Sequence, residues 1–320
     1  MYEDIQCVVC QKNDFQFVYK GYDRLHSIHD EFHIIQCCHC KSHTVWPRLS
    51  QEESKKYYPD DYSCYTIAIE DIKSDFKRID KLIHRKKLCN QVIKRSKVKN
   101  GRILDIGCAT GNFLYGMKNL GWDCYGVEPS EYAATYAKNR FNLNIFNGYF
   151  EKADFPNNYF DVITLWDVLE HTRDPNEMLK KINKLLKSDG VLLLTMPNSQ
   201  SWGRHFFSQY WAGWDIPRHY NAFSPTSIST LFKHNGFIIN DIFGFTGRHG
   251  VFMMSINFWL NDSKLNKTIK KIIHDTLNSI FIRLLLFPFF ILSERFGRSS
   301  TMAISAKKIT EIRYYSDIDK

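Results

Sequence analysis

The chain has 320 residues, 44% of them hydrophobic and 15% aromatic, and its 43 Lys and Arg outnumber its 34 Asp and Glu to give a formal net charge of +9. This length allows one large domain with a small one, or two medium domains. The ordinary apolar content excludes an intrinsically disordered chain, a collagen and a coiled coil. The charge is concentrated, because residues 73–102, the basic segment, hold twelve Lys or Arg and only two Asp.

The sequence contains no pattern typical of export or of membrane spanning. Its first seven residues, MYEDIQC, are acidic and lack an apolar stretch, so we expect no signal peptide. The most apolar run, residues 280–292, has 13 residues and is interrupted by Arg283 and Pro288. A spanning helix needs about 20 apolar residues. We therefore expect a cytoplasmic protein without a transmembrane helix.

Four of the nine cysteines form two CxxC pairs, Cys7 with Cys10 and Cys37 with Cys40. Each pair makes a tight turn that aims two thiolates at one centre, and two such turns complete a tetrahedral sulfur site. The spacing predicts a zinc-ribbon-like cap with a structural zinc, because four protein ligands leave no open position for catalysis. The alternatives that stay open are four free thiols in a small β-rich cap, or a ligand replaced by Cys38, His39, His26, His29 or His33.

From residue 101 onward, strand patterns alternate with helix patterns. Strands are predicted at 102–106, 123–127, 143–146, 160–165, 190–196, 237–243 and 301–306. Helices are predicted at 113–120, 131–141, 175–186 and 225–235, and a further one at about 72–93 carries the basic segment on one face. Such alternation predicts a mostly parallel sheet covered by helices on both faces.

The first of these strands leads into a glycine-rich turn that indicates a nucleoside site. Asp105, near the end of the strand, opens the turn, and Gly107 and Gly111 allow the backbone to pass close to a ligand. Glu128 follows 21 residues after Gly107. An acidic side chain at that distance takes ribose hydroxyls in nucleotide-binding folds. The glycine spacing is not that of the dinucleotide fingerprint, and the carboxylate of Asp105 suits a cationic ligand better than a phosphate.

At this point the chain resembles the class I S-adenosylmethionine (SAM)-dependent methyltransferases, on the motif DIGxxxG at 105–111, the Glu-Pro-Ser run at 128–130 and the segment 161–171. The resemblance implies a Rossmann-like, seven-stranded, mostly parallel sheet whose last strand is antiparallel. It also implies that the turn holds the methionine part of the cofactor, that Glu128 takes the ribose, that the loop after the third strand flanks adenine, and that Trp166 lies against the cofactor. The predicted cofactor-binding residues are Asp105, Gly107, Cys108, Gly111, Asn112, Phe113, Glu128, Pro129, Tyr149, Phe150 and Trp166.

Two narrower resemblances bear on the substrate. The CxxC cap, a Tyr-Tyr-Pro-x-x-Tyr segment and this domain together resemble methyltransferases of bacterial glycan and small-molecule pathways; the sugar C-methyltransferases among them typically carry a further C-terminal domain. The stretch Leu169-Glu170-His171 is similar to the ubiquinone-pathway O-methyltransferases. There an acidic residue in the place of Asp167 helps to bind a divalent cation with the Glu-His pair. The alternative is that Glu170 and His171 cap the following helix without a metal.

Methyl transfer to a hydroxyl benefits from a base, and three residues are predicted for catalysis. We favour His219 as the base; the alternative is that it is a structural partner within the surrounding loop. His171 and Asp167 are the other two candidates. The connection at 202–223 is rich in aromatic residues and is expected to cover the active site. No Asn/Asp-Pro-Pro-Tyr motif ends the fourth strand, which argues against methylation of a nucleobase amine.

Taken together, the patterns divide the chain into a zinc-binding cap (1–65), a basic linker helix (66–100), a SAM-binding domain (101–250) and a helical insertion with the last strand (251–320). We expect SAM-dependent O-methylation of a sugar-containing, lipid-linked or quinone-like small molecule. The alternatives left open are a nucleotide-sugar C-methyltransferase, an inactive SAM-binding subunit of a biosynthetic complex, and an RNA methyltransferase that uses the basic segment. Residues 1–65 lack a basic stripe, which argues against a nucleic-acid finger, and the oligomeric state stays open.

The C-terminal part of the chain combines charge with apolar residues. Lys264, Lys267, Lys270 and Lys271 precede the apolar run at 280–292. Together with the basic segment, this pattern is typical of a peripheral contact with an anionic membrane surface. The alternative is that the first helix packs its apolar face on the sheet while the insertion covers the substrate entrance.

Overall fold

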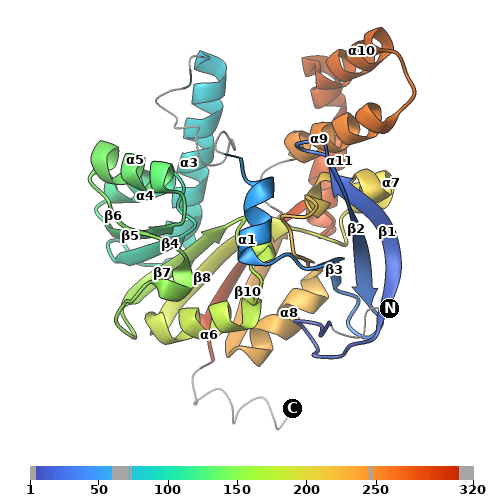
Figure 1. Ribbon diagram of the computed structural model, residues 1–320. Coiled ribbons are helices and arrows are strands. Elements are labelled where there is room, and N and C mark those ends of the chain that lie inside the picture. Colours follow the sequence, from blue (N-terminus) through green and yellow to red (C-terminus); the bar gives the residue numbers. More distant parts are fainter. Residues whose placement is uncertain (1–4, 60–71, 73, 245–247, 310–320) are drawn as a thin grey trace.

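The computed structural model describes residues 5–59, 72, 74–244 and 248–309, and it contains two β-sheets with helices around them (Figure 1). The boundary predicted between residues 65 and 66, and the aromatic residues Tyr62 and Tyr65, lie outside the described residues.

The larger sheet has seven strands in the order β10-β11-β8-β7-β4-β5-β6. Neighbours from β8 to β6 pair in parallel, while β11 is antiparallel to both β10 and β8. This arrangement confirms the predicted fold class. Its strands are β4 (Arg102–Ile106), β5 (Asp123–Glu128), β6 (Asn144–Asn147), β7 (Phe160–Trp166), β8 (Leu186–Pro197), β10 (Phe237–Gly244) and β11 (Thr301–Lys308).

Helices cover both faces of this sheet, which is why its central strands are nearly continuous apolar runs. On one face Leu104 and Leu165 pack with α6 (Pro175–Leu185) and α8 (Pro225–His234). On the other face Ile103 and Val162 pack with α3 (Asp75–Ser96), α4 (Asn112–Lys118) and α5 (Glu131–Phe141). Side-chain caps begin three of these helices: Ser130 caps α5, Asp174 caps α6 and Ser224 caps α8.

Helix α3 carries most of the basic segment, and its two halves differ. In the C-terminal half, Leu88, Cys89 and Val92 are buried against the sheet domain, and Arg95 forms an ion pair with Asp241 at 2.8 Å. In the N-terminal half, Ile79 and Ile83 are 53% and 62% exposed. The packing alternative is thus confirmed for the second half of the helix.

The smaller sheet is antiparallel and has the order β1-β2-β3-β9. Its first three strands belong to the N-terminal cap: β1 (Phe15–Asp23), β2 (Ile28–Cys37) and β3 (His43–Trp46). The fourth, β9 (Asn221–Ala222), comes from the connection between β8 and α8. Between β3 and α3 lie the short helices α1 (Gln51–Ser54) and η1 (Lys55–Tyr57). The cap therefore completes its sheet with a strand from the methyltransferase-like region.

Three helices separate β10 from β11: α9 (Arg248–Asp262), α10 (Lys267–Asn278) and α11 (Ile280–Arg295). Figure 1 shows α10 and the start of α11 projecting upward from the molecule, on the opposite flank from α3. In the part of the chain that the structure describes, no single helix is both long and apolar enough to cross a membrane. Helices α10 and α11 meet that length and composition only when they are taken together, and they are bent by 61° relative to each other.

Candidate active site

The glycine-rich turn connects β4 to α4 in a backbone conformation that requires glycine at two positions. Gly107 and Gly111 have φ values of 73° and 76°, and Gly111 is the N-terminal cap of α4. A Cβ on Gly107 would lie 2.7 Å from Cγ2 of Val168, a residue of the loop after β7. The turn is therefore held close to that loop, at the carboxyl ends of β4 and β7, where ligands bind in open α/β sheets.

Glu128 connects this turn to the end of β5. Its side chain is only 2% exposed, and its two oxygens accept hydrogen bonds from the backbone N–H groups of Ala109 and Ser130, both at 2.8 Å. Burial raises the pKa of Glu128, and the two N–H groups act in the opposite direction. These two hydrogen bonds therefore fix the carboxylate beside the glycine-rich turn.

Asp105 lies beneath the same turn and has an unusual pKa. It is 2% exposed, and the hydroxyl of Thr164 donates to its Oδ1 at 2.7 Å. Burial, reinforced by the negative charge of Glu128, raises the pKa of Asp105 to about 8. Because a cation nearby stabilises the carboxylate, this group favours a positively charged ligand.

Asn112, at the start of α4, offers an unused acceptor. Its Nδ2 donates to the hydroxyl of Thr110 at 2.8 Å, whereas its buried Oδ1 has no hydrogen-bond partner among the described residues. A buried acceptor without a partner costs free energy, so a ligand with an N–H group would be stabilised there. The neighbouring Phe113 packs edge-on against Trp166, with ring centroids 5.3 Å apart.

The other predicted cofactor residues are divided between surface and core. Pro129 is exposed and Tyr149 is 40% exposed. In contrast, Cys108 and Phe150 are 6% and 3% exposed and belong to the hydrophobic core. Because the side chains of Cys108 and Phe150 are buried in the core, only their backbone atoms can contact a cofactor.

The predicted catalytic histidines come together after β7. His171 ends the short helix η4 (Leu169–His171), and its ring centroid lies 4.4 Å from that of His219, with the ring planes at 81°. Glu170 lies beside them: its carboxylate and the two imidazoles each offer a ligand atom within 4.8 Å of the others. Asp167, which is exposed and has a φ of 56°, is not a member of this group. The third donor beside Glu170 and His171 is thus His219 and not the predicted Asp167.

The hydrogen bonds of both histidines determine which nitrogen is free. Nδ1 of His219 lies 2.9 Å from the carbonyl oxygen of Gly213, and Nδ1 of His171 lies 3.1 Å from that of Arg218 and 3.1 Å from the hydroxyl of Tyr58. A carbonyl oxygen only accepts, so each Nδ1 carries a proton and each neutral ring keeps a lone pair on Nε2. Burial, followed by the charge of His219, lowers the pKa of His171 to about 3.

Glu170 is 1% exposed, and neither of its carboxylate oxygens has a hydrogen-bond partner among the described residues. Burial and the charge of Asp167 raise the pKa of Glu170 well above its usual range. The helix that follows is capped by Asp174, whose Oδ1 accepts from the N–H groups of Asn176 and Glu177. The interpretation that Glu170 and His171 cap this helix was therefore wrong, because Asp174 lies closer to the free N–H groups.

Sequence reasoning missed Arg218, which joins the cap to the active site. Its guanidinium donates to both oxygens of Asp23 on β1, at 2.7 and 2.8 Å, and to both oxygens of Asp215, at 3.0 and 2.7 Å. Burial alone would raise the pKa of Asp215, but the hydrogen bonds from Arg218 outweigh it and lower this pKa. Asp215 is therefore held ionised, and its Oδ2 lies 3.8 Å from Nε2 of His219.

The connection at 202–223 packs between the smaller sheet and α9. Trp211 and Trp214 are 1% and 3% exposed and form a core with Ile34 of β2 and Ile256 of α9. These tryptophans therefore stabilise the contact between the cap, the connection and the insertion.

A family model described as a methyltransferase domain matches residues 78–240, which is half of the chain. The chain belongs to this family. With the seven-stranded sheet and its antiparallel β11, this membership confirms the resemblance to the class I SAM-dependent methyltransferases.

Among curated relatives, the chain is similar to a ubiquinone biosynthesis O-methyltransferase of Glaesserella parasuis, with 29% identity over 40% of this chain and 58% of the relative. A mitochondrial ubiquinone biosynthesis O-methyltransferase of Schizosaccharomyces pombe is 32% identical over 29% of this chain and 37% of the relative. The chain thus spans about half the length of these relatives or less. Among solved structures, a putative sarcosine dimethylglycine methyltransferase from Galdieria sulphuraria matches with a TM-score of 0.49 and 13% identity, over 76% of this chain and 91% of that one.

The methyltransferase domain is preceded by the predicted four-cysteine cluster. Sγ of Cys7 lies 3.4 Å from that of Cys40, Sγ of Cys10 lies 3.5 Å from that of Cys37, and all four sulfurs are within 4.8 Å of one another. A tetrahedral zinc with bonds of about 2.3 Å places its sulfurs about 3.8 Å apart. The four thiols therefore fit a zinc ion, which would be structural because they fill every position.

The two CxxC turns that carry these thiols are nearly identical. In each, the residue four positions after the first cysteine donates its N–H to that cysteine's carbonyl, Gln11 to Cys7 and Lys41 to Cys37. Both donors have positive φ, 58° and 60°. The Cys38 and histidine alternatives are not members of the four-sulfur group that the described residues form.

Proposed function

We propose that the chain is a SAM-dependent methyltransferase that transfers a methyl group to an oxygen of a sugar-containing, lipid-linked or quinone-like small molecule. Family membership supports methyl transfer, and the similarity to ubiquinone biosynthesis O-methyltransferases supports oxygen as the acceptor atom.

The residues around the glycine-rich turn fit the cofactor's functional groups. Bound SAM supplies an electrophilic methyl group on a positively charged sulfonium. Oδ1 of Asn112 would accept from its ammonium group, Asp105 would favour its positive charge, and Glu128 would take the ribose hydroxyls. Tyr149 is exposed beside the end of β6 and would flank the adenine.

His219 is the residue that we propose as the base. With Nδ1 held by the carbonyl of Gly213, its Nε2 lone pair is available to take the acceptor's hydroxyl proton. Loss of this proton would make the acceptor oxygen the nucleophile that takes the methyl group of bound SAM, and the sulfur would keep the electron pair of the broken carbon–sulfur bond. Asp215, held ionised by Arg218, would stabilise the resulting imidazolium. This fixed chain of Arg218, Asp215 and His219 is the observation that carries the proposal.

The test measures SAM binding by calorimetry and turnover by release of the demethylated cofactor, with phenols, hydroxylated sugars and nucleotide sugars as acceptors. We expect His219→Gln to lower kcat about 10²- to 10⁴-fold while the affinity for SAM stays the same. Unchanged turnover in this variant would remove the assignment of the base. Tight SAM binding with no turnover on any acceptor would favour the inactive subunit instead.

The donor group of Glu170, His171 and His219 supports a second role for the same site, binding of a divalent cation. The two roles exclude each other at His219, because a coordinated Nε2 has no lone pair left for a proton. Chelation under conditions in which elemental analysis shows that the cap keeps its zinc separates them: the base mechanism predicts that EDTA leaves turnover unchanged, whereas a cation at this site predicts loss of turnover and its recovery with added metal.

A nucleotide-sugar C-methyltransferase is the second candidate, and it is supported by the cap with its four clustered cysteines. The acceptor panel distinguishes it, since the product would then resist the treatments that cleave methyl ethers.

A further inference from the structure

The start of α11 has an apolar surface of unusual exposure. Ile280, Phe281, Leu284 and Leu285 are 62%, 80%, 65% and 72% exposed. The apolar ridge is defined as these four residues together with Phe287, Phe289, Ile291, Leu292 and Phe296, each at least 39% exposed. Large apolar side chains scattered singly on a surface need no explanation, but a contiguous set marks an interaction surface.

The apolar ridge packs against the rest of the protein at its C-terminal end and is exposed at its N-terminal end. Towards the C-terminus of α11, Phe290 and Ser293 are buried, and the ring of Phe289 packs against Trp202 at 5.5 Å. Towards the N-terminus, α11 follows α10 away from the sheets (Figure 1). The exposed half is thus held in place by packing that does not cover it.

Positive charge surrounds the ridge. Residues 264–298 contain seven Lys or Arg and only two acids, Asp275 and Glu294. On α10, Lys267 and Lys271 are exposed beside the exposed side chains of Ile269 and Ile272. Arg283 is turned back from the ridge, since its Nη2 donates to Oδ1 of Asn278 at 2.7 Å.

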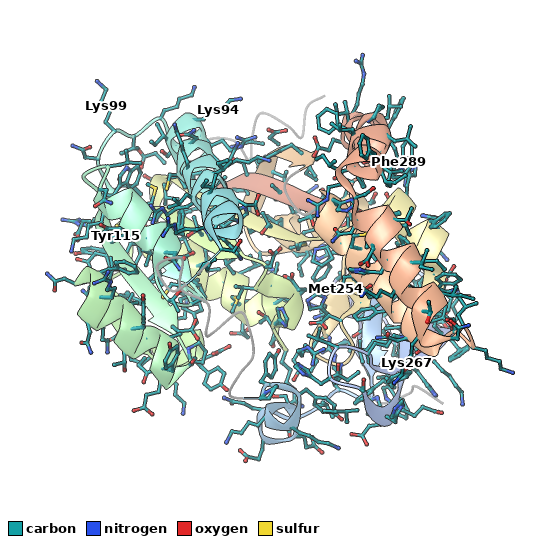
Figure 2. The ribbon with its side chains drawn as sticks, turned by 90° about the horizontal axis from the view of Figure 1, so that it is seen from above. Lys94, Lys99, Tyr115, Met254, Lys267 and Phe289 are labelled. Carbon is teal, nitrogen blue, oxygen red and sulfur yellow. The ribbon has the colours of Figure 1, made fainter. Side chains whose placement is uncertain are left out.

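A second basic helix points to the same side of the molecule. Figure 1 shows α3 and α10 rising on the same side of the molecule but well apart. Figure 2, which looks onto that side, shows α3, labelled at Lys94 in its C-terminal half, apart from α11, labelled at Phe289. The exposed Ile79 and Ile83 lie in the N-terminal half of α3, within the basic segment. The same combination of cations and exposed apolar residues therefore occurs twice on one side.

We propose that this side docks on the surface of an anionic lipid bilayer. The apolar ridge enters the interfacial layer while lysines of α10 and α3 contact the lipid phosphates. Interfacial helices bury an apolar face to a depth of about 5–10 Å, and the exposed side chains of the apolar ridge provide such a face. A second copy of the chain is a poorer occupant, because its matching surface has the same positive charge.

The experiment is cosedimentation of the full chain with vesicles of phosphatidylcholine, alone or mixed with phosphatidylglycerol. We expect binding to the mixed vesicles, at least tenfold weaker binding without the anionic lipid, and weakening by salt because it screens the charges. Leu284→Ser with Leu285→Ser should weaken binding more than tenfold, since burial of even one leucine is worth about that factor. The charge variant Lys267→Glu with Lys271→Glu should weaken binding and reduce its dependence on salt.

The matched control is Leu120→Ser, which changes a leucine that is 46% exposed between α4 and β5; it should bind as the unchanged chain does. Circular dichroism of the leucine variant should be unaltered, because both side chains are already exposed. The proposal is overturned if the unchanged chain does not bind mixed vesicles or if the leucine variant binds equally well. It is also overturned if the chain forms concentration-dependent dimers that the leucine substitutions abolish, without any vesicle binding.

Discussion

Arg218 and Asp23 form a bidentate ion pair between residues 195 positions apart, with side chains 1% and 0% exposed. Asp23 lies on β1 of the cap, and Arg218 lies one position before His219. The same guanidinium holds Asp215, so the cap sheet and the proposed base share one buried network. The position of the cap therefore influences the electrostatics of the active site.

Removal of one member of this network should destabilise the protein strongly. We expect Asp23→Asn to cost about 3–5 kcal/mol of unfolding free energy, because it leaves the buried Arg218 only partly compensated. Urea unfolding measures the change. As a control, Lys180→Met breaks an exposed ion pair with Glu177 and should leave the unfolding midpoint where it was; equal effects of the two substitutions would contradict the buried network.

Cofactor binding should release a proton near neutral pH. With a pKa of about 8, Asp105 is mostly protonated at pH 7 in the free protein. A bound sulfonium stabilises its carboxylate, so affinity for SAM should rise with pH and level off above about pH 8. Calorimetry at pH 7 in two buffers of different ionisation enthalpy counts the proton. Asp105→Asn should bind without that release, and no release from the unchanged chain would refute the assignment.

Glu128 is expected to contribute to SAM affinity directly. In Glu128→Gln the amide keeps the shape, but its NH₂ group faces a backbone N–H group of Ala109 or Ser130 where the carboxylate accepted. Hydrogen bonds to a charged group are worth about 1.5–3 kcal/mol, so SAM should bind about ten- to a hundredfold more weakly. The control is Glu131→Gln on the exposed first turn of α5, which should bind SAM as the unchanged chain does. If the two variants bind SAM equally well, the glycine-rich turn is not the cofactor site.

The four-cysteine cluster predicts about one zinc ion per chain by elemental analysis. Cys37→Ser should lose it, whereas Cys38→Ser should keep it, because Cys38 is adjacent in sequence but outside the sulfur group. Loss of zinc should also lower thermal stability, since a structural zinc contributes folding free energy. Retention of zinc in the first variant, or its loss in the second, would show that the ligand set is wrong.

The parts of the fold that follow local patterns were predictable from the sequence. The helix predicted at 131–141 has those bounds in the structure, because Ser130 caps it and alanines face the sheet. The glycine turn was predictable too, since Gly107 and Gly111 are the residues that its backbone requires.

What could not be predicted depends on distant contacts. No sequence pattern around Asp23 or Arg218 indicates that the two residues form an ion pair. Strand β9 has only two residues, too few to show any periodicity. The burial of Trp211 and Trp214 between the smaller sheet and α9 could not be predicted either, because their packing partners come from distant parts of the chain. The third donor beside Glu170 and His171 was misassigned for the same reason, because His219 approaches through the fold and not along the chain.

The pairing of β9 with β3 makes the cap inseparable from the domain it covers. Residues 5–59 alone would present β3 as an open edge, and the methyltransferase domain alone would carry a strand with nothing to pair with. In evolution, exchange of the cap between relatives would therefore require the loop that carries Arg218 and His219 to be inherited with it. The first and the fourth fifths of this chain are one heritable unit, although some 160 residues separate the end of the cap from Arg218.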